Sequence, residues 1–288
     1  MAGSQAFPLT DPSRDHDILR IAQGLRSAGE MFFTSGFDLL SRDKDPVRVA
    51  SLEHAVDLHL QKFLPESGEG WLSEESTDDH ARLDSRRVWV VDPLDGTSEF
   101  VAGIPEWSIS IGLFEDGLPV AGGVHHPATG EIFLGTVENG VTLNGESAPA
   151  REPKRIAETL VLASRSEVRR GEWAHLQSAP FQVCPIGSVA YKLARVAAGL
   201  ADATWTLLPK HEWDVAAGVA LVCAAGGMVR TLDGHFPLFN RPEPLFPGLL
   251  AFANSCRRHF EMSRESCAEW PKTGDWESGV PARLVAPR

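Results

Sequence analysis

The chain has 288 residues and a formal net charge of −12, with 43% hydrophobic and 23% charged residues. This composition is typical of a globular protein with a sizeable core, and the length suits one large domain or two lobes. The negative charge argues against nucleic-acid polymers and anionic membranes as partners. An acidic protein that binds an anionic substrate needs a local cation, which a metal ion would supply.

Targeting signals are not evident in the sequence. Residues 1–12 are uncharged over most of their length and have no apolar segment typical of a secretory signal, and no apolar run is long enough to span a bilayer. The cysteines are scattered and form no C-x-x-C pair, which fits reduced thiols. We therefore expect a cytoplasmic protein.

The first half of the chain is expected to be a lobe of two helices packed on an antiparallel sheet. Apolar residues recur at helical spacing in residues 17–33 and 49–63, and Pro65 ends the second helix. Apolar or alternating segments predict four strands, at residues 88–91, 107–114, 119–125 and 131–135. Two Asn-Gly pairs, at residues 139–140 and 144–145, predict hairpin turns. We assign this lobe to residues 1–152.

The second half has an alternating helix and strand pattern, which is typical of an α/β lobe. The charged residues 151–155 suggest the boundary, so this lobe is assigned to residues 153–270 and a loose tail to residues 271–288. Ser188 is expected to cap a helix that Gly199 ends, and Asp214 is expected to be the first residue of an apolar helix. Strands are predicted at residues 160–163, 203–207, 228–232 and 249–253. The predicted class is α/β in layers, with an α+β N-terminal lobe.

Residues 88–100 are the most informative segment. An apolar strand leads directly into Asp92 and Asp95. Asp92 precedes a proline and is therefore predicted to end the strand, and Asp95-Gly96 is a turn signal. Two carboxylates on one tight turn can share Mg²⁺, which prefers oxygen ligands and keeps positions open for water and phosphate. Gly96 and Thr97 predict a helix start whose free N–H groups suit a phosphate. The alternative is that the aspartates only cap the turn.

Two further acidic sites flank this turn in the sequence. Glu74-Glu75 follows the apolar pair Trp71-Leu72, and Trp213-Asp214 opens an Ala-rich and Gly-rich segment. Taken singly, the glutamates would be typical of a solvated surface and Asp214 of a helix N-cap.

In this order the three motifs resemble the inositol monophosphatase superfamily of Mg²⁺-dependent, Li⁺-sensitive phosphatases. The superfamily pattern is Glu-Glu-Ser/Asp, then D-P-[LI]-D-G-T, then W-D-x-A-[AG]. The corresponding segments here are Glu74-Glu75-Ser76, Asp92-Pro93-Leu94-Asp95-Gly96-Thr97 and Trp213-Asp214-Val215-Ala216-Ala217-Gly218. The resemblance spans residues 17–254 and implies the layered sugar-phosphatase fold.

The resemblance also implies roles for individual residues. The metal ligands would be Glu74, Asp92, Asp95, Asp214 and the carbonyl of Leu94. The backbone of Gly96 and Thr97 would bind the phosphate, and Thr97 and Glu74 would orient the attacking water. Elementary chemistry agrees, because four clustered carboxylates need cations to neutralise them and two cations can stabilise both the attacking and the leaving oxygen.

One segment departs from the superfamily pattern. Members usually have V-T-x-A-D before the Glu-Glu motif, and that aspartate supports a third metal site and partners the motif threonine. This chain has Val47-Arg48-Val49-Ala50-Ser51, so Ser51 replaces the aspartate and Arg48 replaces the threonine. A hydroxyl is a poor Mg²⁺ ligand, so we expect two Mg²⁺ sites and a weak or absent third. Arg48 either supplies a fixed charge near the phosphate or points to solvent.

The motif variants are most similar to the 3′(2′),5′-bisphosphate nucleotidase branch. That branch is represented by Leu72-Ser73-Glu74-Glu75, the Ser98-Glu99-Phe100 continuation and Ser164-Arg165-Ser166. Inositol monophosphatases commonly have a glutamate seven residues before the third-motif aspartate, where Leu207 stands here. The favoured substrate is therefore 3′-phosphoadenosine 5′-phosphate, with loss of its 3′-phosphate. The candidate substrate contacts are Arg165, Ser188, Lys192 and His211.

Two alternative functions stay open. One is hydrolysis of an inositol, sugar or cyclitol monophosphate, and the other is a catalytically silent homologue that binds a ligand. In either case the expected partner is a small phosphorylated molecule. By resemblance to the superfamily, a homodimer is expected.

Overall fold

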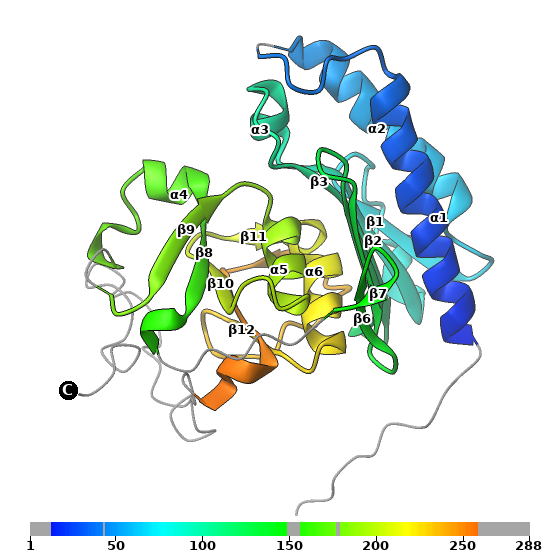
Figure 1. Cartoon of the computed structure of the whole chain (residues 1–288). Coiled ribbons are helices and arrows are strands. Elements are labelled where there is room, and N and C mark those ends of the chain that lie inside the picture. The colour runs from blue at the N-terminus through cyan, green and yellow to red at the C-terminus, as the bar shows by residue number, and fades with distance from the viewer. Residues whose placement is uncertain (1–12, 43, 149–155, 177–178, 259–288) are drawn as a thin grey trace, which may run out of the picture.

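The computed structural model describes residues 13–42, 44–148, 156–176 and 179–258. Figure 1 shows two long helices on one face of a large sheet, a second pair of helices on its other face, and a smaller sheet beyond that pair. This is the layered α/β arrangement that the sequence predicted. The predicted lobe boundary at residues 151–155 and the predicted tail at 271–288 lie outside the described residues.

The outer helical layer consists of α1 (Ser13–Thr34) and α2 (Pro46–Phe63), which confirms both predicted helices. Asp45 caps α2 by accepting a hydrogen bond from the N–H of Val47, and Pro46 occupies the first helical position, where its missing N–H costs nothing. The apolar faces of both helices pack on the sheet around the buried side chains of Phe32 and Trp107.

The large sheet has seven strands in the order of the sequence. They are β1 (Glu69–Ser73), β2 (Arg87–Asp95), β3 (Ser108–Glu115), β4 (Leu118–His126), β5 (Glu131–Thr136), β6 (Gly140–Leu143) and β7 (Glu146–Ser147). The prediction of an antiparallel sheet is correct from β2 to β7 and wrong for β1, which pairs parallel to β2. Strand β1 is not predicted from the sequence, because its only apolar residues, Trp71 and Leu72, are too few to show a strand pattern.

Strand β2 does not end at Asp92, which corrects the prediction from the following proline. Asp92 pairs with Ser110 and Asp95 pairs with Ser108, so β2 has one more residue than β3 between these two pairs. This bulge accommodates Pro93, which has no N–H to donate to the ladder. The strand therefore runs through both aspartates and orients them at its end.

The inner helical layer contains α5 (Val189–Ala197) and α6 (Glu212–Ala224), with the short α3 (Thr97–Val101) and α4 (Arg165–Arg169) near the ends of strands. Helix α6 is apolar on all sides because it packs against the large sheet, α5 and the smaller sheet. It begins at Glu212 rather than at Asp214, which corrects the prediction. Asp214 is its third residue, and its Oδ2 accepts a hydrogen bond from the N–H of His211.

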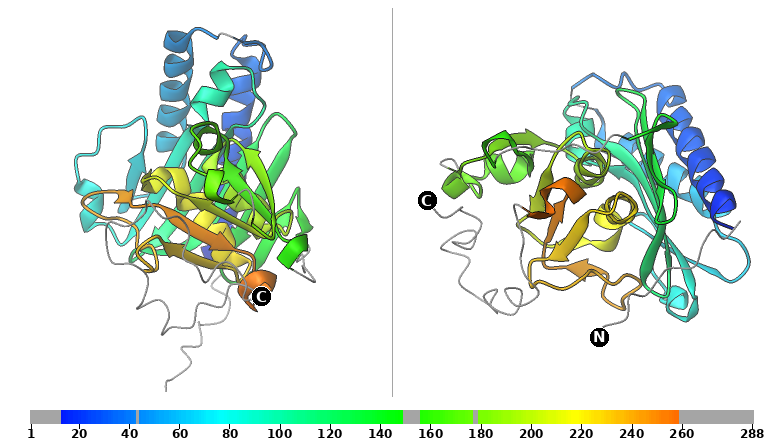
Figure 2. Two further views of the ribbon diagram at one scale, coloured as in Figure 1. Left: turned by 90° about the vertical axis from the view of Figure 1, so that its left-hand side faces the viewer. Right: turned by 60° about the horizontal axis from the view of Figure 1, so that its bottom comes forward.

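The smaller sheet has the order β12, β14, β10, β8, β9. Its strands are β8 (Leu160–Ser164), β9 (Gln182–Ile186), β10 (Ala203–Thr206), β12 (Met228–Thr231) and β14 (Leu249–Phe252), while β11 (Lys210–His211) and β13 (Leu245–Phe246) form a separate pair. Figure 2 shows α5 and α6 enclosed between the two sheets. Short 3₁₀ turns occupy Ala81–Asp84, Ile156–Glu158, Ala174–Leu176 and Asn254–Arg258.

Candidate active site

Four carboxylates come together where β1, β2 and α6 meet. The parallel pairing of β1 and β2 places Ser73 opposite Val91. Glu74, the first residue after β1, therefore lies beside Asp92, which is still paired with β3. Asp95 follows at the end of β2, and the first turn of α6 brings Asp214 to the same place. Their mutual electrostatic effects show this proximity, since Asp214, Asp95 and Glu53 all raise the pKa of Glu74.

Burial and like charge together favour the protonated form of these groups. Burial and then the charges of Asp214 and Asp95 raise the pKa of Glu74 to about 7. Burial and the charge of Asp95 raise the pKa of Asp214 to about 6. The pKa of Asp92 lies well above its usual range for the same reasons. An array of this kind is stable in its charged form only when cations neutralise it.

The donor set fits Mg²⁺, because every side chain in the cluster is a carboxylate. No three acidic, histidine or cysteine side chains of the described residues already converge on one ion-sized point. A cation bound there would offset the mutual repulsion of the carboxylates. The predicted metal-ligand roles of these residues therefore stay predictions.

The turn between the two aspartates is organised by short hydrogen bonds. The N–H of Leu94 donates to Asp92 Oδ1 at 2.9 Å, and Thr97 Oγ1 lies 3.1 Å from the Leu94 carbonyl oxygen. Gly96 has a φ of 101°, and a Cβ there would lie 3.0 Å from the carbonyl oxygen of Glu106. The turn therefore requires glycine, and it leaves the backbone at residues 96–97 close to the acidic cluster.

Asp95 is held in place by the start of α5. Its Oδ2 accepts hydrogen bonds from the Ser188 hydroxyl and from the N–H of Ala190, both at 2.6 Å. Burial raises the pKa of Asp95, and these two bonds act in the opposite direction. Ser188 also caps α5 by accepting from the N–H of Tyr191 at 3.0 Å. In this structure the predicted substrate contact Ser188 is thus a partner of Asp95 and a helix cap.

Substitution of Ser188 by alanine is expected to weaken Mg²⁺ binding by about 10-fold to 100-fold, because Asp95 loses one of the two donors that fix its orientation. The matched control is Ser108→Ala, since the Ser108 hydroxyl lies 2.9 Å from the Ser188 hydroxyl, whereas the donors to the Asp95 carboxylate are Ser188 and Ala190. Calorimetric titration of both variants with Mg²⁺ measures the difference. Equal affinities for the two variants would contradict the positioning role of Ser188.

Arg165 is paired with an acidic side chain in this structure. Its Nε donates to Glu106 Oε2 at 2.7 Å and its Nη2 to Glu106 Oε1, while the N–H of Gly187 donates to the same Oε2 at 2.7 Å. Glu106 therefore connects α4 to the segment that precedes Ser188. Arg165 is still half-exposed, but it must leave Glu106 before it can bind a second phosphate.

The other two predicted substrate contacts differ in their exposure. Lys192 is 1% exposed, and burial lowers its pKa to about 8 despite the nearby charges of Glu167 and Asp95. His211 is exposed, and its ring stacks on Trp213 at a centroid distance of 4.3 Å. Lys210, next to His211, is half-buried and lowers the pKa of both Asp95 and Asp214 by its charge. It is the cation that adjoins the cluster from the side of α6.

Thr97 has a partner, Glu53, that is not among the residues predicted from the sequence. Its Oγ1 lies 2.8 Å from Glu53 Oε1, and Glu53 is only 8% exposed. Ser51 is exposed and donates to the Val47 carbonyl oxygen of its own helix. Arg48 is exposed and lies over the ring of Phe37 at 4.6 Å. A glutamate two residues after the expected acidic position is the sequence signal that could have identified Glu53.

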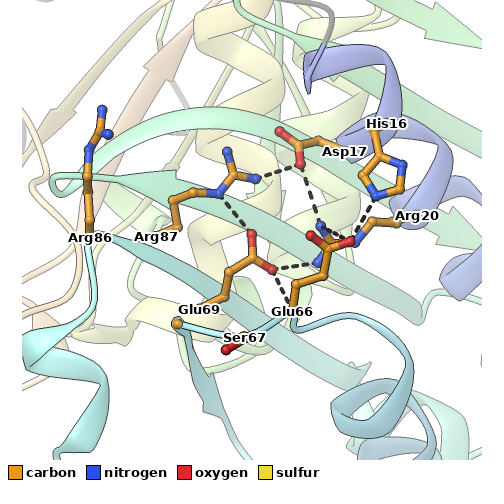
Figure 3. Close-up of a pocket in the computed structure, with 9 residues that line it drawn as sticks. His16, Asp17, Arg20, Glu66, Ser67, Glu69, Arg86 and Arg87 are labelled. Atoms are coloured by element: carbon orange, nitrogen blue, oxygen red, sulfur yellow. Dashed lines mark hydrogen bonds and ion pairs between the residues drawn. The ribbon is translucent and has the colours of Figure 1, made fainter.

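A polar cavity of about 320 Å³ lies at the opposite end of β1 and β2. Figure 3 shows Arg87 between Asp17 and Glu69, and Arg20 beside Glu66 and Glu69, while Arg86 points away from this group. Burial would raise the pKa of Glu69, but bonds from Trp89, Glu66, Arg20 and Arg87 lower it to about 2. Because these charges neutralise each other, the cavity is not a second acidic site. Its ion pairs join α1 to the sheet.

The layered α/β fold, with an acidic cluster beside a glycine turn at a strand end, is that of the sugar-phosphatase class. The chain belongs to the inositol monophosphatase family, whose model matches residues 37–262. It is therefore a hydrolase that acts on phosphate monoesters of small molecules, in a family that is generally Mg²⁺-dependent. No helix in the described part of the chain has the length and apolarity needed to cross a membrane.

Individual relatives bear names from both branches of the family. The chain is 31% identical over 237 residues to the inositol-1-monophosphatase ImpA of Mycolicibacterium smegmatis, covering 78% of this chain and 85% of that protein. It is 37% identical over 205 residues to a 3′-phosphoadenosine 5′-phosphate phosphatase of Mycobacterium bovis, covering 68% and 73%. The crystal structure of CysQ from Bacteroides thetaiotaomicron matches with a TM-score of 0.72 at 25% identity, over 83% of this chain and 97% of that one.

Proposed function

We propose that this protein removes the 3′-phosphate from 3′-phosphoadenosine 5′-phosphate in a Mg²⁺-dependent reaction. The observation that supports this choice most is its similarity to a phosphatase of that name, at 37% identity, against 31% identity to the inositol-1-monophosphatase ImpA. Leu207 at the position that commonly holds a glutamate in inositol monophosphatases points the same way. An apolar side chain there offers no acceptor for a polyol.

In this proposal the scissile phosphate binds at the turn after β2. Glu74, Asp92, Asp95, Asp214 and the Leu94 carbonyl would hold Mg²⁺. When bound, Mg²⁺ neutralises the phosphate oxygens and stabilises the charge that develops during in-line displacement. The backbone of Gly96 and Thr97 orients the phosphate. Glu74 and Thr97 would orient the attacking water, and the Glu74 carboxylate is the group in reach that could accept its proton.

The second phosphate needs a cation outside the acidic cluster. Lys210 is the best placed for this role, since it adjoins Asp95 and Asp214 and is half-buried rather than enclosed. Lys192 is buried and acts in this proposal as a fixed countercharge behind Asp95. Arg165 could contribute only after release from Glu106.

The test is a phosphate-release assay on 3′-phosphoadenosine 5′-phosphate, inositol 1-phosphate and fructose 1,6-bisphosphate, each with Mg²⁺, with EDTA and with added Li⁺. We expect the highest kcat/KM on the adenosine bisphosphate, no turnover in EDTA, and inhibition by Li⁺. A higher kcat/KM on inositol 1-phosphate would replace the proposal with the inositol alternative. If no phosphate is released from any of the three substrates, the alternative of a catalytically silent homologue that binds a ligand would be favoured.

The inositol alternative is supported by the ImpA relative, which aligns with a larger share of this chain. Leu207→Glu is expected to raise kcat/KM for inositol 1-phosphate by about 10-fold, because one hydrogen bond to a charged acceptor is worth ~1.5 kcal/mol. The control is Leu207→Gln, which has the size of glutamate without its charge. It is needed because the buried Glu167, which accepts a hydrogen bond from the Leu207 N–H, would repel a new negative charge at residue 207. An unchanged substrate preference in both variants would show that residue 207 does not contact the substrate.

A further inference from the structure

The hydrogen bond between Thr97 and Glu53 joins the turn after β2 to helix α2 of the outer helical layer. Glu53 lies on the inner side of α2 and reaches Thr97 Oγ1 with its Oε1 at 2.8 Å. Ser51, at the position where the superfamily has an acidic partner for this threonine, is exposed and satisfied by the Val47 carbonyl. The chain therefore presents a carboxylate to Thr97 from a different position on the same helix.

The Thr97 hydroxyl has one proton and two acceptors within reach. Glu53 Oε1 is at 2.8 Å and the Leu94 carbonyl oxygen at 3.1 Å. A carboxylate is the stronger acceptor, so the proton is directed to Glu53. With the proton directed to Glu53, the two lone pairs of Thr97 Oγ1 remain available as acceptors.

The burial of Glu53 indicates that its carboxylate serves to bind Thr97 rather than to keep the helix soluble. Its side chain is 8% exposed, and in the described residues the acidic groups next to it are Glu74 and Glu75 rather than basic ones. A carboxylate that served only to solubilise the helix would lie on its outer face. Here it lies where its charge is costly and where its described hydrogen bond is to Thr97.

We propose that Glu53 is the positioning residue for Thr97 and takes over the function of the acidic residue that is missing at Ser51. This inference rests on the proposed phosphatase mechanism, in which Thr97 orients the attacking water. Glu53 acts through Thr97 and does not contact the substrate. The acidic partner of the motif threonine is thus moved by two residues along α2 in this chain, rather than lost.

The kinetic test is a double-mutant cycle on the full-length protein with Mg²⁺ and the best substrate. Glu53→Ala is expected to lower kcat by about 10-fold to 100-fold with KM changed less than about 3-fold, because orientation of the water is lost while phosphate binding persists. Glu53→Gln, which keeps an acceptor oxygen, should recover part of the loss. In a Thr97→Ala background, Glu53→Ala should cost less than about 3-fold. An equal loss in both backgrounds would overturn the proposal.

The control is Ser51→Ala, which removes an exposed hydroxyl from the same helix and should leave kcat unchanged. A kcat loss in Ser51→Ala as large as in Glu53→Ala would assign the effect to α2 itself rather than to Glu53, and would overturn the proposal.

A second measurement does not depend on turnover. The melting temperature is measured for wild type, Glu53→Gln, Thr97→Val and the double variant. The shift of the double variant should differ by a few degrees from the sum of the two single shifts, because one hydrogen bond couples the two side chains. Additive shifts would overturn the Glu53 proposal. A wild type that releases no phosphate from any tested substrate would instead overturn the proposed function, and the melting cycle would still decide whether Glu53 and Thr97 interact.

Discussion

Asp95→Asn is expected to abolish phosphate release, with kcat/KM reduced on the order of 10³-fold or more, while the protein stays folded. The carboxylate lies at the centre of the acidic cluster, where a metal ion would supply several kcal/mol of charge stabilisation in the transition state. Asparagine has almost the same shape, and its side-chain oxygen can still accept from the Ser188 hydroxyl and the Ala190 N–H. The substitution therefore removes the charge and leaves the packing.

The measurement compares kcat/KM, Mg²⁺ affinity by calorimetry, and the circular dichroism spectrum of the variant with those of wild type. Asp116→Asn is the control, because Asp116 is exposed on the turn between β3 and β4 and its φ of 51° is one that asparagine tolerates well. Asp116→Asn should behave as wild type in all three. Turnover above about a tenth of wild type in Asp95→Asn would contradict the proposed mechanism.

Glu74→Gln is expected to raise the melting temperature of the metal-free protein at pH 7.5 by a few degrees and to leave it nearly unchanged at pH 5. A carboxyl with a higher pKa in the folded than in the unfolded chain binds its proton more tightly when folded. Its contribution to the free energy of unfolding is present below the unfolded pKa and is lost as the pH rises through the folded pKa. For Glu74 this loss spans pH 4.5 to about 7, and for Asp214 it spans pH 3.8 to about 6.

Saturating Mg²⁺ should reverse the difference at pH 7.5, because the ion stabilises the charged cluster of wild type more than that of the variant. Thermal melts in EDTA and in Mg²⁺ at the two pH values measure both effects. The comparison is made between variants because burial lowers the pKa of His125 and of His126, which acts on the total stability in the opposite direction. Glu30→Gln, an exposed glutamate on α1, is the control. A metal-free Glu74→Gln protein less stable than wild type at pH 7.5 would contradict the repulsion described for the cluster.

The local features of the active site could be predicted from the sequence because they depend on neighbouring residues. The Asp95-Gly96 turn and the Ser188 cap of α5 are each set within four residues of chain. The helical periodicity of α1 and α2 has the same origin. Predictions were wrong where contacts with distant residues override local preferences. The proline at 93 predicts that the strand ends at Asp92, but pairing with β3 through a bulge extends it to Asp95.

The sequence by itself determined the family, the layered α/β class, and the acidic residues of the three motifs, because residue type and order within short segments are enough for these. Only the tertiary structure decided that β1 runs parallel to β2 and so sets Glu74 beside Asp92, that Glu106 holds Arg165, and that Glu53 rather than Ser51 meets Thr97. These contacts join residues far apart in the chain. Their geometry follows from how the sheet and helices pack. A glutamate near the expected acidic position suggests a candidate, but only the packing of α2 on the sheet shows that Glu53 reaches Thr97, 44 positions later in the chain.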